Sequence, residues 1–443
     1  MKRFYNVLIN TLIANVTTSY LWFALTFWVY LETESVLATS IIGGAYFACV
    51  AIFSLLFGTI VDKHKKKNVM VGATAFTLGA YVLAGIVYLL FPRSDLSDYT
   101  SIGFWLFTLI ILLGGVVEMM RNIALSTTVT LLVPEDRRAN ANGLVGTVQG
   151  LAFLVTSVFS GLSIGLVGMG WTLVIAIALT AVALAHIAFV RIPEKHIVHD
   201  PELANKRIDL KGSMLAIKIV PGLLALILFS TFNNFLGGAY IALMDPYGLT
   251  LFPVEIWGIV LGITSAGFII GGLLVAKKGL GKNPIRTMLL INVAMSVLGM
   301  TFTIRELWWL YVVGILLYMV LIPIVEAAEQ TIIQKVVPYK QQGRVFGFAQ
   351  SVESAAAPIT SFAIGPIAEF ILIPYMNSQA GQSAFGWLLG EGEARGIALI
   401  FLFAGLIGVV VTGLAFLTKS YRILSDTYAK SHKDVPVEAE VSK

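Results

Sequence analysis

Three glutamates stand in long apolar stretches of the sequence, where ionisable side chains are rare. Glu326 and Glu329 are three positions apart, and Glu353 follows in the next apolar stretch. Residues three apart share one face of a helix, so the first two carboxyls would lie side by side. Loss of hydration and mutual repulsion both favour the protonated form of such groups. Unless they are neutral packing residues, these glutamates suit a carrier of protons.

Glu118 and Arg121 form a second ionisable pair, with opposite charges at the same helical spacing. A charge at the centre of a membrane-spanning helix costs at least about 2.5 to 3.5 kcal/mol on insertion scales, so each group needs a partner or water. Either the two neutralise each other, or they line a cavity in which Arg121 binds an anion or controls the proton of Glu118.

Polar and aromatic side chains in the apolar stretches are candidates for lining a substrate cavity, although such side chains more often serve packing than contact. Together with Arg121, these candidates are Asn15, Trp22, Gln149, Asn233, Asn234 and Tyr240. The five histidines show no paired spacing typical of metal ligands, so we expect neither a metal nor a cofactor. No nucleophile and base stand out as a catalytic set, so we do not expect an enzyme.

The elements that must position these residues are membrane-spanning helices. Of the 443 residues, 57% are hydrophobic and 12% are charged, and the mean hydropathy is +0.86. A soluble surface cannot be built from this composition, and a spanning helix needs about 20 apolar residues. The apolar stretches predict twelve spans, at approximately 7–30, 37–61, 69–91, 103–132, 141–167, 170–191, 215–243, 255–276, 285–303, 307–335, 344–366 and 395–418.

Basic residues distinguish the two sides of the membrane. The connections on one side, with both chain ends, hold most of the 30 Lys and Arg residues, whereas the other side has only Arg93, Arg305 and Arg395. By the positive-inside rule the basic side is cytoplasmic. We therefore expect a multi-pass protein of the cell membrane with both termini in the cytoplasm. Its positive charge is topogenic and implies no nucleic-acid partner.

Two six-helix halves follow from this pattern. We expect them at 1–192 and 215–418, joined by a cytoplasmic linker at 193–214 and followed by a cytoplasmic tail at 419–443. The halves resemble each other, because the turns at Pro134 and Pro338 lie 204 residues apart and each precedes a glycine-containing span. Such internal repeats are typical of transporters that bind substrate between their halves.

The segment from Gly58 to Lys67 is similar to a signature of the major facilitator superfamily. That signature reads G-x-x-x-D-(R/K)-x-G-(R/K)-(R/K). The chain matches it at Gly58, Asp62, Lys63, Lys66 and Lys67 and departs from it at Lys65. The turns at 131–136, 190–193 and 343–346 resemble those of the macrolide-efflux branch of the drug:proton antiporters. The resemblance implies an all-α integral membrane fold of twelve transmembrane helices in two pseudo-symmetric bundles.

The resemblance also implies roles for particular residues. In this fold the first, fourth, seventh and tenth helices line the cavity and the eleventh flanks it, which would bring Glu326, Glu329 and Glu353 to one space. A cytoplasmic gate would form where Asp62, at the end of the second helix, meets the start of the eleventh. Its members would be Gly58, Asp62, Lys63, Lys66, Lys67 and Arg344.

Two departures from the branch bear on mechanism. The fifth span lacks the Gly-Pro pair of the antiporter signature, and Gly114 stands where an arginine is common in the fourth span. Arg121 lies about two turns closer to the cytoplasm than that position, so the resemblance does not assign the family's proton-relay role to it.

We predict a proton-coupled secondary active exporter, of the multidrug or macrolide antiporter type, for amphiphilic or cationic small molecules. The chain has no G-x-x-x-x-G-K-(S/T) loop, so its energy must come from a gradient. Its partners would be the substrate, protons and the lipid bilayer, and it would act as a monomer. The proton-coupling candidates are Glu326, Glu329, Glu353 and Glu118.

Two other functions remain open at this point. The same fold could carry a sugar, siderophore, peptide or lipid, although the spans offer few polar groups for a hydrophilic solute. The chain could also be a non-transporting membrane sensor or scaffold, against which the deep acids argue.

Overall fold

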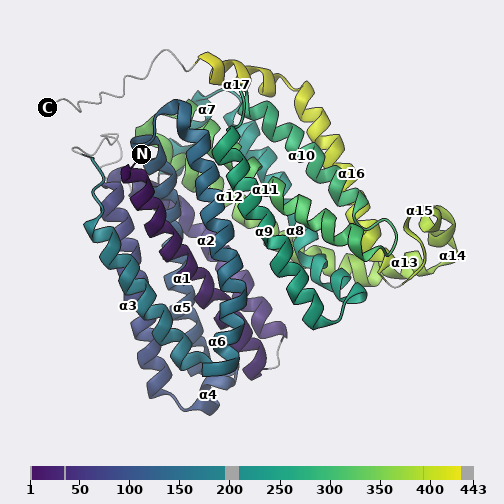
Figure 1. The fold of residues 1–443 in the computed structure, drawn as a ribbon, viewed down its shortest axis with the longest axis horizontal. Coiled ribbons are helices and arrows are strands. Elements are labelled where there is room, and N and C mark those ends of the chain that lie inside the picture. The colour runs from purple at the N-terminus through teal and green to yellow at the C-terminus, as the bar shows by residue number, and fades with distance from the viewer. Residues whose placement is uncertain (1, 34–35, 195–208, 393, 431–443) are drawn as a thin grey trace.

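The computed structural model describes residues 2–33, 36–194, 209–392 and 394–430. Every regular element in these ranges is helical, and the long helices form two bundles that stand side by side (Figure 1). The N-terminal bundle contains α1 (Lys2–Thr33), α2 (Val36–Lys63), α3 (Lys66–Leu90), α4 (Arg93–Ser97), α5 (Ile102–Leu132) and α6 (Arg138–Phe189). The C-terminal bundle contains α7 (Leu210–Ile219), α8 (Leu223–Leu251), α9 (Val254–Lys278), α10 (Pro284–Thr301), α11 (Trp308–Val336), α12 (Tyr339–Ile367) and α16 (Arg395–Leu417), and α17 (Lys419–Lys430) follows.

The predicted twelve spans correspond to eleven long apolar helices within the described residues. The difference arises in α6, whose 52 residues include a break at Gly168, where φ is 74°. A helix of that length would measure about 78 Å at 1.5 Å per residue, far more than the roughly 30 Å apolar core of a bilayer. Counted on either side of Gly168, α6 supplies the two spans expected at 141–167 and 170–191.

The start of the seventh span differs from the prediction. The sequence pattern placed it at 215–243, but α7 ends at Ile219 and α8 begins only at Leu223. Pro221 and Gly222 separate them, and Gly222 has a left-handed φ of 87°. Because proline cannot continue the hydrogen-bond ladder and this φ favours glycine, the chain turns here despite its continuous hydropathy.

Two helix pairs join the bundles, α2 with α12 and α6 with α9. Each crossing is close because small residues face each other. A Cβ added to Gly58 of α2 would collide with the backbone of Gly343 and lie 3.1 Å from the Cα of Gly347, both in α12. A Cβ added to Gly143 of α6 would lie 2.8 Å from the carbonyl oxygen of Gly272 in α9. The two seams are thus related in the way that the internal repeat predicts.

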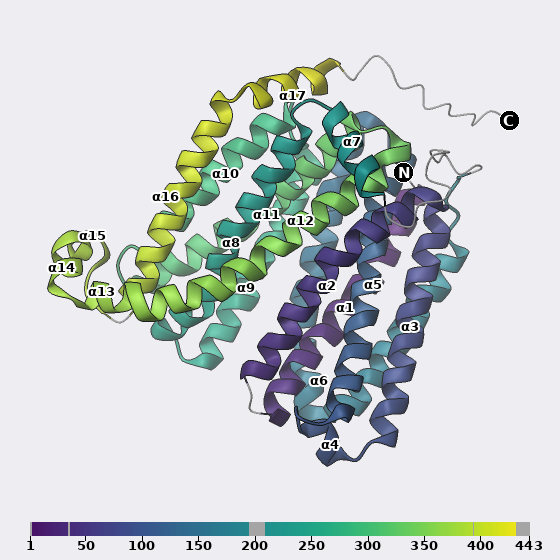
Figure 2. The same cartoon turned by 180° about the vertical axis from the view of Figure 1, so that it is seen from behind.

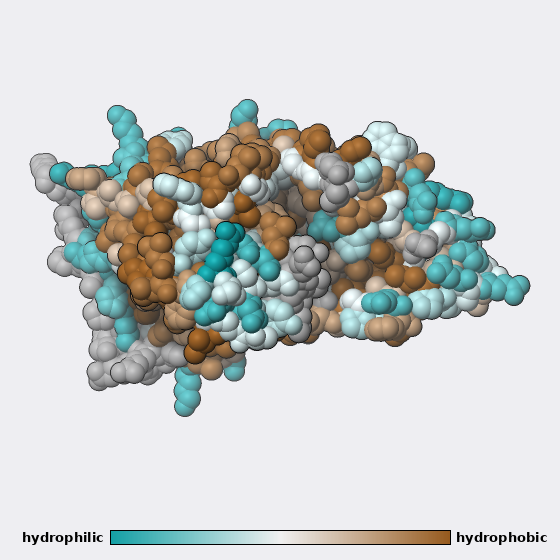
Figure 3. Space-filling model, turned by 90° about the horizontal axis from the view of Figure 1, so that it is seen from below, coloured by the Kyte–Doolittle hydropathy of each residue, from teal (hydrophilic) through white to brown (hydrophobic). Residues whose placement is uncertain are grey.

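The bundles meet at one end and separate at the other. Both seams lie toward the end at which α1 begins and α17 lies, which we call the α17 face (Figure 2). Figure 3 looks onto the opposite face, where the surface is hollowed between the two halves. The interior is therefore reached from the face opposite α17.

Residues between α12 and α16 form a lobe of short helices that projects from the C-terminal bundle (Figure 1). Its elements include a π-helix at Ala368–Leu372, α13 (Ile373–Asn377), α14 (Gln379–Gly381), a second π-helix at Gln382–Gly386 and α15 (Trp387–Leu389). The Arg305 guanidinium donates to the Trp387 carbonyl at 2.6 Å and ties the lobe to the start of α11.

Candidate functional site

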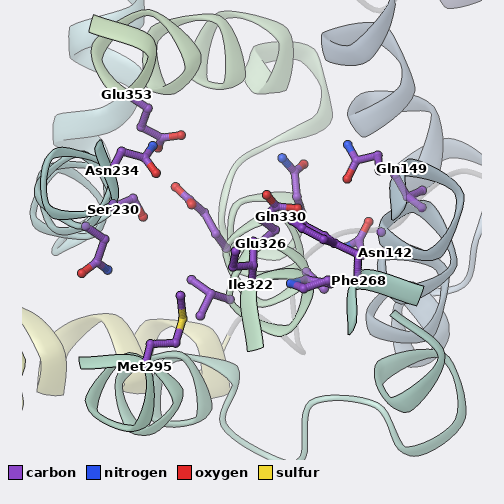
Figure 4. A pocket seen from close by; sticks show the side chains of 18 of the residues that line it. Asn142, Gln149, Ser230, Asn234, Phe268, Met295, Ile322, Glu326, Gln330 and Glu353 are labelled. Carbon is purple, nitrogen blue, oxygen red and sulfur yellow. The ribbon is translucent and has the colours of Figure 1, made fainter. Parts of the chain in front are cut away.

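A cavity of about 540 Å³ lies between the bundles and extends into the C-terminal bundle. Its lining comes from α5, α6, α8, α9, α10, α11, α12 and α16. Figure 4 shows side chains from both halves around one space, with Gln149 on one side, Asn234 and Glu353 on the other, and Glu326 between them. Among the described residues, neither α1 nor α2 contributes to this lining.

The three glutamates of α11 and α12 all line the cavity. The carboxyl groups of Glu329 and Glu353 interact directly with each other. One oxygen of each is buried without a hydrogen-bond partner, and no ion pair joins either of them, or Glu326, to a cation within the described chain. A carboxylate without a cation is disfavoured in a mostly apolar environment, so these groups are suited to hold a proton or a cationic ligand.

Carboxamide side chains form the second feature of the cavity. Eight of them line it: Asn122, Asn142, Gln149, Asn233, Asn234, Asn292, Gln330 and Gln350. Some are held by the protein, since Asn142 donates to Thr331 Oγ1 at 2.8 Å. Others can still form hydrogen bonds, since Asn233 Nδ2 and Gln330 Oε1 are buried without a hydrogen-bond partner. The expectation that the spans offer few polar groups was wrong, because amides scattered over six helices converge in space.

Aromatic and thioether side chains cover the remaining wall. Tyr240, Tyr318, Phe268, Phe302, Phe401, Met295 and Met319 belong to this group. Tyr240 packs against Tyr318 with ring centroids 5.5 Å apart and against Phe401 at 5.0 Å. Such a surface accommodates flat or branched apolar groups, and its methionines can adapt to irregular shapes.

The structure thus brings together seven of the residues singled out in the sequence. Glu326, Glu329, Glu353, Gln149, Asn233, Asn234 and Tyr240 all line the cavity. It also adds residues that the sequence did not single out, among them Asn122, Asn142, Asn292 and Gln350. No local pattern marks these amides. Their only signal is a polar side chain in an apolar helix.

Glu118 and Arg121 lie elsewhere, inside the N-terminal bundle. Arg121 Nε is 3.6 Å from the Glu118 carboxylate, and the Arg121 guanidinium donates to the Asn10 side-chain oxygen at 2.6 Å. Thr77 donates to Glu118 at 3.3 Å. Neither charged residue lines the cavity. The geometry is that of a neutralised pair embedded in protein, which is the first of the two interpretations that the sequence left open.

The two candidates in α1 are also outside the cavity. Trp22 packs on Tyr46 of α2 with ring centroids 4.4 Å apart. Asn15 is partly buried one turn from Thr11, which together with Asn10 faces Arg121.

The residues expected to form a gate meet at the α17 face. The Asp62 carboxylate accepts from the backbone N–H groups of Gly343 at 2.7 Å and Arg344 at 2.9 Å, and lies 3.3 Å from Arg344 Nε. Gly58 is in van der Waals contact with Gly343 one turn away. The acid therefore joins α2 of one half to the first turns of α12 in the other.

Two lysines of this segment bond to residues at the end of the N-terminal half. Lys66 pairs with Glu194 at 3.4 Å, and Lys67 donates to the Ala188 carbonyl at 2.7 Å. Lys63 is half-buried at the end of α2.

The second seam has no charge at the matching positions. Asn140 precedes Arg344 by 204 residues and donates to the carbonyl of Ala276, the residue that stands in place of Asp62. That hydrogen bond measures 2.9 Å. One seam is thus ionic and its repeat is neutral.

A family model described as "Major Facilitator Superfamily" matches residues 7–361. Among curated proteins, the chain is similar to "Macrolide efflux protein A" of Streptococcus pyogenes, with 24% identity over 368 residues that cover 81% of this chain and 87% of that protein. It is also similar to the protein of the same name from Enterococcus faecalis, with 25% identity over 335 residues covering 73% and 98%.

Solved structures share the fold. A bacterial homologue of the iron transporter ferroportin in an outward-facing state matches with a TM-score of 0.67 and 15% identity, over 94% of this chain and 100% of that chain. The human organic anion transporter MFSD10 matches with a TM-score of 0.64 and 13% identity, over 92% and 99%. At these identities the likeness concerns the fold alone.

Proposed function

The chain belongs to the major facilitator superfamily of membrane transporters, and on this premise we propose that it is a proton-coupled exporter of cationic, amphiphilic small molecules. The observation that carries the proposal is the cluster of Glu326, Glu329 and Glu353 in the cavity, to which no cation of the described residues is paired. Relatives named for macrolide efflux support the direction of transport.

Competition at the carboxyls supplies the coupling. Two carboxyl groups can share a hydrogen bond only when one of them holds a proton, so the contact of Glu329 with Glu353 suits the protonated cavity. A cationic substrate would replace that proton as the neutralising charge. Each therefore excludes the other, and a carrier that alternates its access would exchange protons for substrate.

The lining supports a substrate with one cationic group and several hydroxyl or carbonyl groups. The carboxyls neutralise the charge, amides such as Gln330 and Asn233 bond the polar groups, and the wall around Tyr240 accepts the apolar part. Specificity in such sites comes from a few placed polar groups on an apolar surface.

Orientation follows from the positive-inside rule. We infer that the α17 face is cytoplasmic, so that the cavity faces outward and the seam at Asp62 closes the cytoplasmic side. In this state protons from outside would reach the glutamates, release the substrate and prepare the return of the carrier.

The test uses proteoliposomes with an imposed pH gradient and ethidium or erythromycin as the transported compound. Wild type is compared with Glu326→Gln, Glu329→Gln and Glu353→Gln, and Glu369→Gln serves as the control because Glu369 is exposed outside the cavity. We expect gradient-driven transport in wild type and the control, and loss of coupling in at least one cavity variant. Transport that ignores the pH gradient in wild type would overturn the proton coupling.

A second candidate is a carrier for a neutral, hydroxyl-rich solute, which the eight amides favour. Competition distinguishes the two. A panel of sugars should leave ethidium transport unchanged if the first proposal holds, and should inhibit it if the polar solute is the natural cargo.

A further inference from the structure

The cavity has a branch that leaves the interface between the halves and enters the C-terminal bundle. It reaches α10 and α16, which lie on the side of this bundle away from the N-terminal half (Figure 2). Its opening lies between α8 and α11, which make few contacts with each other. Figure 4 shows the Met295 side chain of α10 pointing into the space beside Ile322. We call the part of the cavity bounded by Asn292, Met295 and Phe401 the side branch.

The end of the side branch nearer the α17 face is polar. Asn233, Asn292 and Glu329 lie about 10 to 15 Å along their helices from the ends beside α17, at 1.5 Å per residue. The Asn292 amide donates to the Met288 carbonyl at 2.9 Å, which leaves its oxygen to accept. Asn233 Nδ2 is buried without a hydrogen-bond partner. Together the two amides offer one acceptor and one donor to a ligand.

The other end of the side branch is aromatic. Its lining there comes from the rings of Tyr240, Phe302, Tyr318 and Phe401. Each ring stands about 25 Å along its helix from the end beside α17. The Tyr240 hydroxyl donates to the Phe401 carbonyl at 3.3 Å, and a Cβ added to Gly299 of α10 would collide with the Tyr240 ring. These contacts hold Tyr240 in place as part of a closed end that suits a flat apolar group.

An apolar passage joins the two ends, which are about 10 to 15 Å apart along the helix axes. Met295 of α10 and Ile322 of α11 stand in this passage and face the same space (Figure 4). Glu329 stands at the polar end, where its carboxyl interacts with that of Glu353. The side branch therefore leads from the carboxyl groups to the rings.

We propose that the side branch is a subsite for the ring system of an elongated cationic amphiphile, whose charged group stays at Glu329 and Glu353. This rests on the proposed function, which supplies the cationic substrate. The carboxyl groups neutralise the ammonium group, the two amides bond a neighbouring hydroxyl or carbonyl group, and the aromatic end accepts the ring. The ligand class is an amine whose ring system stands about 10 Å or more from its charge.

The C-terminal half then holds both the charge and the ring of the substrate. The carboxyl groups and the side branch belong to α8, α10, α11, α12 and α16. The N-terminal half contributes neutral side chains to the cavity, such as Asn142 and Gln149. The substrate therefore stays with the C-terminal half when the carrier alternates its access.

The experiment measures equilibrium binding to the full chain in lipid nanodiscs by isothermal titration calorimetry, without a proton gradient. Two probes carry the same naphthyl and trimethylammonium groups, joined by one methylene in the short probe and by eight in the long probe. Met295→Trp fills the passage of the side branch, and Met295→Leu is the matched control that keeps it open. Empty nanodiscs correct for partition of the probes into lipid.

We expect Met295→Trp to weaken binding of the long probe at least about tenfold, because its ring no longer reaches the aromatic end. The short probe does not enter the passage, so its affinity should stay within about twofold. Met295→Leu should leave both affinities within the same limit. Ile322→Trp, which fills the passage from the opposite helix, replaces Met295→Trp if that variant does not fold.

Two other results would contradict the subsite. Equal weakening of both probes by Met295→Trp, or no weakening of either, would show that the ring does not occupy the side branch, and the proposed function would stand. If neither probe binds to wild type, the cationic substrate class of the proposed function is wrong and the subsite fails with it.

Discussion

The buried acids of the two halves of the transporter differ in whether a cation lies beside them. In the N-terminal half, Glu118 is 3.6 Å from Arg121 and both are enclosed by α1, α3 and α5. In the C-terminal half, Glu329 and Glu353 contact each other and line the cavity, with no cation bonded to them in the described chain. A paired charge contributes to the fold, whereas an unpaired carboxyl is available to a proton or a ligand. On this difference we propose a structural role for the Glu118–Arg121 pair and a role in transport for the glutamates of the cavity.

The repeat makes this comparison direct. Glu353 of α12 and Gln149 of α6 stand 204 residues apart, at equivalent positions of the two halves. Both line the same cavity from opposite sides (Figure 4). Related positions thus hold an acid in one half and its neutral isostere in the other, and the substitutions below exploit that relation.

The largest effect is expected from Arg121→Leu. It leaves Glu118 buried without its cation, and breaking a buried pair in this way costs about 3–5 kcal/mol. We expect the free energy of unfolding in detergent to fall by that amount, measured by chemical denaturation. Glu118→Leu combined with Arg121→Leu should recover most of the loss. A single variant as stable as wild type would refute the structural role of the pair.

Glu353→Gln should reduce transport strongly but change stability little. The amide has the same shape but cannot exchange a proton, so the initial rate of gradient-driven transport should fall at least about tenfold, which corresponds to 1.4 kcal/mol. Stability should change by less than about 1 kcal/mol, because no ion pair is broken. Transport assays and denaturation of the same preparation check both parts. A large loss of stability would place Glu353 with the structural acids instead.

Gln149→Glu tests whether an acid on the other side of the cavity can serve the same substrate. The new carboxylate should tighten binding of a cationic compound about threefold to tenfold, a gain of about 1 kcal/mol for a partly hydrated charge pair. Fluorescence binding of ethidium measures it, and a neutral amphiphile provides the control. Equal gains for both ligands would show that charge is not the cause.

The smallest effects are expected for substitutions of two asparagines, which should differ in their effect on the apparent KM. Asn234 lines the cavity and Asn15 does not. Loss of one hydrogen bond to a ligand costs about 0.5–1.5 kcal/mol, so Asn234→Ala should raise the apparent KM roughly twofold to tenfold. Asn15→Ala should leave the KM within about twofold. Transport titrations with the same compound compare them, and an effect of Asn15→Ala as large as that of Asn234→Ala would contradict the assignment of the cavity.

Much of the architecture could be predicted from the sequence, because a helix needs about 20 apolar residues to cross a bilayer and a charged side chain within such a helix is energetically costly. The ends of α5, at Leu132, and of α11, at Val336, lie within one residue of their predicted positions. The exception at Pro221 and Gly222 shows the limit. A hydropathy pattern does not reveal a backbone turn that lies inside a continuous apolar stretch.

The candidate site could be predicted only in part. Charge in an apolar helix is visible in the sequence, and so Glu326, Glu329 and Glu353 could be found there. Whether a charge has a partner was decided by tertiary structure. Arg121 donates a hydrogen bond to Asn10, 111 residues away in the sequence, and Arg344 donates one to Asp209, 135 residues away. The periodicity of one helix does not predict contacts between residues so far apart in the sequence.

The sequence by itself determined the twelve crossings, the two related halves and the identity of the deep acids, since these depend on local composition and on the cost of moving groups from water into lipid. Only the tertiary structure decided which acids meet a cation and which meet the cavity. That outcome depends on which faces of distant helices pack together, and small residues such as Gly58 and Gly143 set this packing by allowing backbones to approach.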